Sequence, residues 1–188
     1  MKNLKFYILI IAIILISACG GLTEKQKKSA EDAVSALKKI NAGVEIGINN
    51  SEYSKLLIEA QASVNQATEN LPDKEFDEFR QALKLATEAY SDARIVWNKA
   101  GTDKILFACE IKFPEKSKNP AEESMMGFYT SKCDPKIYQL AQKYKIPRSE
   151  IYNDVKLPAM YLDEGLSTIW KKAKEHTDRA SNILKSKT

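Results

Sequence analysis

Residues 76–97 read FDEFRQALKLATEAYSDARIVW, and the spacing of their apolar side chains decides the fold class. Apolar residues recur at intervals of three and four positions, which is the period of one helix face. The seam consists of Phe76, Phe79, Leu83, Ala86, Tyr90, Ala93 and Trp97. Gly101 is expected to end this helix. Because a helix with one narrow apolar stripe is not stable alone, the segment predicts partner helices that cover the stripe.

Three further segments have the same pattern and clear boundary signals. Thr23 with Gln26 predicts a capping box at the start of a helix that runs to about residue 46, where Gly47 suits a left-handed C-cap. Asn49 with Glu52 predicts a second capping box, and Pro72 with Asp73 separates that helix from the next. The last helix is expected to begin near Pro158. Their seams are Ala30, Ala33, Val34, Leu37, Ile40 and Val44; Tyr53, Leu57, Ala60, Val64, Ala67 and Leu71; and Leu162, Leu166, Ile169, Ala173, His176, Ala180 and Ile183.

These four segments predict a mainly all-α fold, an antiparallel four-helix bundle formed by residues 23–188. Residues 102–157 form an irregular insertion between the third and fourth helices. The alternative is a long coiled-coil hairpin that dimerises. The short connections at residues 47–51 and 72–74 favour the bundle, because they let the chain fold back on itself.

The insertion contains local signals of its own. Residues 107–113 alternate apolar and polar side chains, which predicts a strand, and residues 125–133 are expected to return as a second strand or a short helix. Asp134 and Pro135 then open a helical turn. Cys109 and Cys133 are expected to form a disulfide that staples the insertion in an oxidising compartment. Metal binding by these two cysteines is disfavoured, because no second pair of ligands has zinc spacing.

The N-terminus carries a targeting signal. Lys2 and Lys5 precede an apolar run over residues 6–16, and the sequence ISACG occupies residues 16–20. A basic start, an apolar core and small residues before a cleavage point are typical of a secretory signal peptide. With its cysteine, the motif resembles the lipobox of bacterial lipoproteins. The resemblance implies a signal peptide at residues 1–18, cleavage before Cys19, lipidation of Cys19 and a lipidated tether at residues 19–22.

The lipobox resemblance also implies where the protein is located. Acyl chains on Cys19 would make the membrane its first partner, and the absence of aspartate at Gly20 favours the outer membrane, facing the periplasm or the cell surface. An uncleaved signal anchor is the alternative, although the apolar run is shorter than the roughly 20 residues that a spanning helix needs. The first 18 residues hold two lysines and no acid, so the net charge of +4 falls to +2 in the remaining 170 residues. This mixed charge gives no nucleic-acid footprint.

Two helical segments resemble parts of exported bacterial proteins. They are YSDA at residues 90–93 with Trp97, and Ile169 and Trp170 with Ala173 and His176. This resemblance covers the bundle, leaves the insertion aside and implies no chemistry.

His176 is the only histidine, and it lies on the seam of the last helix. We interpret it as a core-edge residue, and the alternative is a base or a ligand. Di-iron bundles need two Glu-x-x-His motifs, so a single histidine excludes a di-iron site. Covalent haem needs a Cys-x-x-Cys-His motif, which the sequence lacks. Haem ligation between His176 and Met125, Met126 or Met160 stays open. No cofactor is predicted, and the sequence contains no Gly-x-Ser-x-Gly motif or phosphate loop.

Aromatic residues give the remaining functional signal. Tyrosine and tryptophan are preferred anchors of protein interfaces. The candidate interaction surface consists of Tyr129, Tyr138, Tyr144, Tyr152 and Trp170. The sequence therefore predicts a lipid-anchored, non-catalytic envelope protein that has a structural role or binds an unidentified envelope protein. The alternatives are a module that binds a small apolar ligand between the helices, and an enzyme centred on His176.

Overall fold

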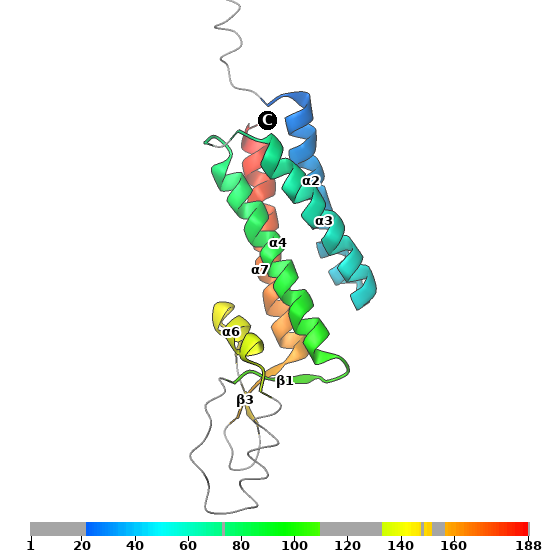
Figure 1. Cartoon of the computed structure of the whole chain (residues 1–188), viewed down its shortest axis with the longest axis vertical. Helices are drawn as coiled ribbons and strands as arrows, with labels where there is room; N and C mark the ends of the chain where they lie inside the picture. The colour runs from blue at the N-terminus through cyan, green and yellow to red at the C-terminus, as the bar shows by residue number, and fades with distance from the viewer. Residues whose placement is uncertain (1–21, 73, 110–132, 148, 152–156, 188) are drawn as a thin grey trace, which may run out of the picture.

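The computed structural model describes residues 22–72, 74–109, 133–147, 149–151 and 157–187. Within these ranges the chain is mainly helical, with five helices and one three-stranded sheet. The long helices are α2 (Glu24–Ile46), α3 (Asn50–Asn70), α4 (Asp77–Ala100) and α7 (Leu162–Lys187), and α6 (Pro135–Lys143) is short. The long helices lie side by side and alternate in direction along the chain (Figure 1).

The predicted caps of the first two helices are confirmed. The Thr23 side chain accepts a hydrogen bond from the backbone N–H of Gln26, and the Gln26 side chain accepts one from the Thr23 backbone. Asn49 and Glu52 form the same reciprocal pair at the start of α3. Gly47 ends α2 in the left-handed conformation, with φ of 85°. These caps satisfy backbone groups that have no partner within the helix.

Helix α4 begins without a side-chain cap. Its N-cap is Phe76, which makes no side-chain capping bond, and Asp73 lies outside the described residues. Asp77 and Glu78 occupy the first turn, where negative charge interacts favourably with the helix dipole. Gly101 ends the helix at positive φ, as predicted.

The predicted seams form the core of the molecule. All seam residues of α2, α3 and α4 are buried except Val44 and Trp97, which are half-buried. The seam predicted for α7 holds from Leu166 to Ala173 and at Ala180, but in its second half the buried face moves by one residue. Thr177, Ser181 and Leu184 are buried there, whereas His176 and Ile183 are half-buried. An α-helix drifts by about 20° per heptad from a strict seven-residue repeat, which explains this shift.

The predicted helix start at Pro158 is wrong. Residues Leu157–Tyr161 form strand β3, and α7 begins at Leu162. Strand β3 lies between β1 (Ile105–Phe107) and β2 (Ser149–Ile151), and it is antiparallel to both. The Leu162 N–H donates to the Lys104 carbonyl at 2.9 Å, so alternate residues of β3 direct their amide nitrogens towards β1. Pro158 has no N–H, which explains why pairing with β1 stops at Ala159.

The strand predicted at residues 107–113 is only partly correct. Strand β1 begins two residues earlier and ends at Phe107, and residues 110–113 lie outside the described residues. Leu106 and Ala108 are buried in the core with Met160, whereas Phe107 is half-buried. The sequence pattern placed Phe107 on the apolar face, and a shift of one residue reverses the two faces of a strand. Of the segment predicted at residues 125–133, all but Cys133 also lies outside the described residues.

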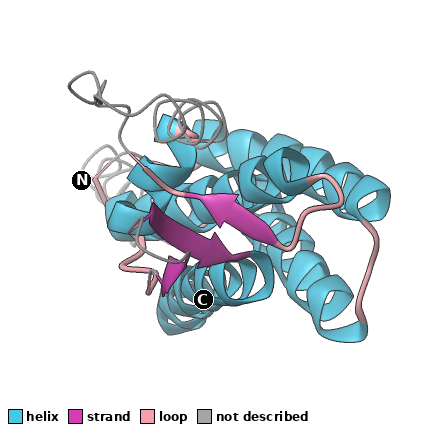
Figure 2. Ribbon diagram, turned by 90° about the horizontal axis from the view of Figure 1, so that it is seen from below, coloured by secondary structure: helices cyan, strands magenta, loops and turns pink. Residues whose placement is uncertain are grey.

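The described parts of the insertion are joined at Cys133. A disulfide links Cys109 and Cys133, whose Cα atoms are 5.3 Å apart, and Cys133 forms a parallel bridge with Phe107. The side chain of Asp134 caps α6 through the N–H groups of Lys136 and Ile137, so the helical turn predicted at Pro135 is confirmed. The sheet lies across one end of the long helices (Figure 2). None of the helices in the described ranges is long and apolar enough to cross a membrane.

Candidate functional site

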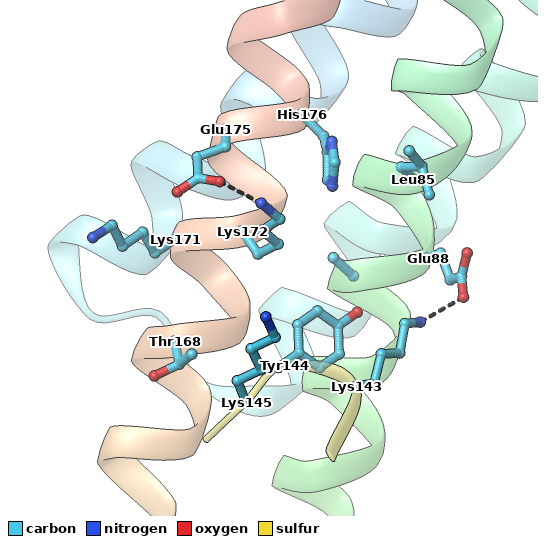
Figure 3. Close-up of a pocket in the computed structure, with 11 residues that line it drawn as sticks. Leu85, Glu88, Lys143, Tyr144, Lys145, Thr168, Lys171, Lys172, Glu175 and His176 are labelled. Carbon is cyan, nitrogen blue, oxygen red and sulfur yellow. Dashed lines mark hydrogen bonds and ion pairs between the residues drawn. The ribbon is translucent and has the colours of Figure 1, made fainter. Parts of the chain in front are cut away.

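A pocket of about 400 Å³ lies where α4, α7 and the C-terminal end of α6 meet (Figure 3). Its lining residues come from all three elements: Leu85, Glu88 and Ala89 from α4; Lys143, Tyr144 and Lys145 from the end of α6; and Thr168, Lys171, Lys172, Glu175 and His176 from α7. The lining therefore has four lysines against two glutamates. In Figure 3, Tyr144, Lys145 and His176 face the space between the helices, whereas Lys171 projects away from them.

A buried carboxylate attaches the end of α6 to α4. Asp92 is only 7% exposed, and its Oδ2 atom lies 2.6 Å from the Lys143 ammonium nitrogen and 2.9 Å from the Tyr144 hydroxyl, which donates to it. The same ammonium group also binds Glu88 on the surface of α4. A buried charge is tolerated when it is paired and hydrogen-bonded. These contacts thus fix one wall of the pocket.

The pKa values of Lys143 and Tyr144 reflect their contacts with Asp92. Burial lowers the pKa of Lys143, but the hydrogen bonds that its ammonium group donates to Asp92 and Glu88 outweigh this effect and hold the pKa above its ordinary value. Burial and the neighbouring Asp92 carboxylate raise the pKa of the Tyr144 hydroxyl. Lys143 therefore stays charged and Tyr144 stays protonated at neutral pH. Lys143 is already committed to two carboxylates and has little capacity for a further anion.

Lys145 has an unusual backbone conformation at the edge of the pocket. Its φ is 52°, which makes it the one non-glycine residue with positive φ in the described ranges. It follows the end of α6, where the Lys145 N–H donates to Gln142 and the Ile146 N–H donates to Ala141. Glycine or asparagine is the usual residue at such a position, because a Cβ atom costs about 1–2 kcal/mol there. A strained residue at a pocket is a reason to ask what its side chain does.

The carboxylates of the pocket do not pair with His176. Glu175 binds Lys172 at 2.8 Å, and Glu88 binds Lys143. Partial burial and the positive charge of Lys172 lower the pKa of His176, so the imidazole is neutral at pH 7. A histidine that acts as a base is usually oriented by a carboxylate or another acceptor, and neither glutamate of the pocket takes that role.

Metal and haem ligation find little support in the described ranges. No group of three or more His, Cys, Asp and Glu residues there could hold a metal ion. Met160 packs beside Gly165, and at 1.5 Å per residue this position is about 16 Å along α7 from His176. These two residues therefore cannot be axial ligands of one haem iron. Met125 and Met126 lie outside the described residues.

A second cluster, of aromatic side chains, lies between α3, α4 and α7. The rings of Trp97 and Trp170 lie 5.6 Å and 6.0 Å from the ring of Tyr53, and 5.6 Å from each other. The fully buried Tyr53 hydroxyl donates to the Tyr90 carbonyl at 2.8 Å and accepts from the Trp170 indole at 3.3 Å. The Tyr90 hydroxyl donates in turn to Asn41 on α2. This cluster joins the long helices to one another.

The structure does not gather the predicted interaction residues in one place. Tyr144 lies in the pocket, Trp170 in the aromatic cluster, and Tyr138 is half-buried on α6. Tyr129 and Tyr152 lie outside the described residues, as does the lipidation site predicted at Cys19.

Sequence reasoning missed Asp92, Lys143 and Lys145. Asp92 had a detectable signal, because it lies at helical spacing between Ala89 and Val96 on a second, largely apolar stripe of α4. A carboxylate in such a stripe indicates a cationic partner from elsewhere in the chain. No family model matches the chain, and comparisons with curated proteins and with solved structures give no significant match.

Proposed function

We propose that this protein is a lipid-anchored, non-catalytic component of a bacterial envelope, built as an antiparallel four-helix bundle that presents an interaction surface at its far end. The lipobox-like sequence before Cys19 supports the anchor. The buried seams of α2, α3, α4 and α7 support the bundle. The placement of the two ends of the molecule supports the orientation and carries the proposal.

The start of α2 lies at the opposite end of the long helices from α6 and the sheet (Figure 1). Near the start of α2, the Gln26 side chain donates to the Asn70 carbonyl, and at the same end Lys187 lies over the Phe76 ring. Three residues separate Cys19 from Thr23, so a lipid on Cys19 would hold this end within about 14 Å of the bilayer. Helix α7 has 26 residues and is about 39 Å long, so the sheet and α6 would face away from the membrane.

The chemistry of the described pockets bears on the alternative of an apolar ligand. The seam aromatics pack against one another, and six of the eleven residues that line the pocket beside α6 are charged. Grooves on α2 with α3 and on α3 with α4 are also lined mostly by polar and charged residues. We therefore favour interaction through the far end over an apolar ligand held between the helices.

Site-specific photo-crosslinking in cells tests this proposal. A crosslinking amino acid at Tyr161, which is 43% exposed in the sheet, should yield a discrete protein adduct. The matched control is Ile58, which is 57% exposed on the side of α3 and should yield none. Cys19→Ala should abolish fatty-acid labelling, release the protein and remove the Tyr161 adduct. Equal labelling of Cys19→Ala and wild type would refute the anchor, and equal adducts from Tyr161 and Ile58 would refute the far-end surface.

A further inference from the structure

We propose that the pocket between α4, α6 and α7 binds a small phosphate-bearing ligand, with the phosphate among Lys145, Lys172 and His176 and the apolar part against Tyr144 and Leu85. Phosphate binding by this pocket does not rest on the lipid anchor or on a protein partner, and only the choice between two phosphate sources uses the orientation that the proposed anchor sets. The binding itself depends only on how residues 85–89, 143–145 and 168–176 are placed.

The available positive charge comes from two lysines. Lys145 is held at the pocket edge by its left-handed backbone, and no ion pair is recorded for it among the described residues. Lys172 pairs with Glu175, but both side chains are about half exposed, so this is a surface ion pair that an incoming dianion can replace. Thr168 lies one turn before Lys172 on α7 and also lines the pocket.

The rest of the lining limits the size and shape of the ligand. The Tyr144 ring, Leu85 and Ala89 supply the apolar part of the lining. A volume of about 400 Å³ is within the range of small-molecule sites and is too small for a folded partner. Lysine binds phosphate as a point charge, and a phosphate ester carries about two negative charges near pH 7. An anionic group joined to a ring or short apolar body therefore fits this lining.

Two sources could supply such a phosphate: a phospholipid headgroup or a soluble phosphate ester. Lys172 lies about 22 Å along α7 from the end of the helix at Lys187, which is the end that a lipid on Cys19 would hold at the bilayer. Headgroups of that membrane would not reach the pocket of an upright bundle. The soluble ester is therefore the favoured source.

The single histidine makes the binding test direct. The full acylated chain in non-ionic detergent, labelled at histidine, gives one set of imidazole NMR signals, which would be titrated between about pH 5 and about pH 8. The charged groups that face or flank His176 are Glu88, Lys143, Lys145, Lys171, Lys172, Glu175 and Arg179. Saturating phenyl phosphate should raise the pKa of His176 by about 1 unit, because an adjacent anion favours the imidazolium form. Phenol, which has the same ring without the charge, should leave it unchanged.

Three variants separate a built site from general surface charge. Lys172→Gln should weaken phenyl phosphate binding about tenfold. The matched control, Lys174→Gln, removes an exposed lysine of the same helix that also has an ion-pair partner, Asp178, and should change affinity less than twofold. Lys145→Gly should also weaken binding about tenfold, yet melt at the same or a higher temperature, because glycine accepts positive φ. Loss of binding would then not reflect unfolding.

Each remaining outcome either supports or overturns the proposal. An unchanged pKa of His176 in phenyl phosphate, an equal shift in phenol, or an equal loss of affinity in Lys174→Gln would overturn it. Nanodiscs that contain phosphatidylglycerol, compared with nanodiscs of phosphatidylcholine alone, distinguish the sources. A pKa of His176 already raised by phosphatidylglycerol would assign the site to a lipid headgroup. The same pKa in both nanodiscs, with a shift only on adding phenyl phosphate, would assign it to a soluble ester.

Discussion

Replacing Tyr53 with phenylalanine tests whether the aromatic cluster holds the long helices together. The Tyr53 side chain is completely buried, so the substitution removes one hydroxyl and leaves the ring in place. That hydroxyl donates to the Tyr90 carbonyl on α4 and accepts from the Trp170 indole on α7. One oxygen on α3 thus connects three helices.

The expected loss of stability follows from these two hydrogen bonds. A buried hydrogen bond contributes about 1 kcal/mol net, and the donor left without a partner adds to the loss. The bond from Trp170 is long, at 3.3 Å, and its side chain is half-buried, so water can replace part of it. We expect Tyr53→Phe to lower the free energy of unfolding by about 2 kcal/mol. For a chain of this size that corresponds to a melting temperature about 4–8 °C lower.

Urea denaturation followed by tryptophan fluorescence measures this loss. The chain has only two tryptophans, and the rings of both contact Tyr53, so the signal reports on the cluster itself. Tyr161→Phe is the matched control, because Tyr161 is 43% exposed and should change stability by less than about 0.5 kcal/mol. In a double-mutant cycle, Tyr53→Phe and Trp170→Phe should be coupled. Equal midpoints for Tyr53→Phe and Tyr161→Phe, or additive effects in the cycle, would refute the reasoning.

Three further perturbations follow from the geometry. Gly165→Ala would place a Cβ atom 2.7 Å from the sulfur of the buried Met160, so it should lower stability by about 1–3 kcal/mol in thermal melts. Serine at both Cys109 and Cys133 should cost about 3.5 kcal/mol by denaturant titration, since the disulfide closes a loop with a sequence separation of 24 residues. The pKa of Lys143 is raised in the folded state, so its contribution is complete below about pH 10 and should be lost as pH rises further. Alkaline melts should show a smaller pH-dependent loss in Lys143→Gln than in wild type.

The parts of the fold that depend on nearby residues could be predicted from the sequence. Each capping box joins residues three positions apart, and Gly47 needs only the end of its own helix, so these features were identified correctly. The seams of α3 and α4 were also correct, because burial repeats with the helix period whatever the partner is. The seam of α7 was correct only until the accumulated drift moved Thr177 into the position expected for His176.

The start of α7 could not be predicted, because it depends on β1 and β2, the two strands that pair with β3. Pro158 suits the first turn of a helix, and locally that interpretation was sound. The competing structure is an antiparallel pairing of Leu106 with Met160 and of Glu150 with Pro158. Such pairings give no signal in the local sequence around Pro158. Backbone groups of β1 and β2 need partners, and extending residues 157–161 supplies them, at the cost of one helical turn.

The pocket could not be predicted from the sequence, and the contacts of Asp92 explain why. Its partner Lys143 lies 51 residues away, on a helix whose position depends on the disulfide at Cys133 and on the cap at Asp134. A buried carboxylate in α4 is costly unless a cation reaches it, so the face of α4 that carries Asp92 is complete only once α6 has docked. Docking in turn brings Lys145 to α7 and creates the pocket. Asp92, which makes α4 depend on α6, is therefore also the residue that fixes one wall of the candidate site.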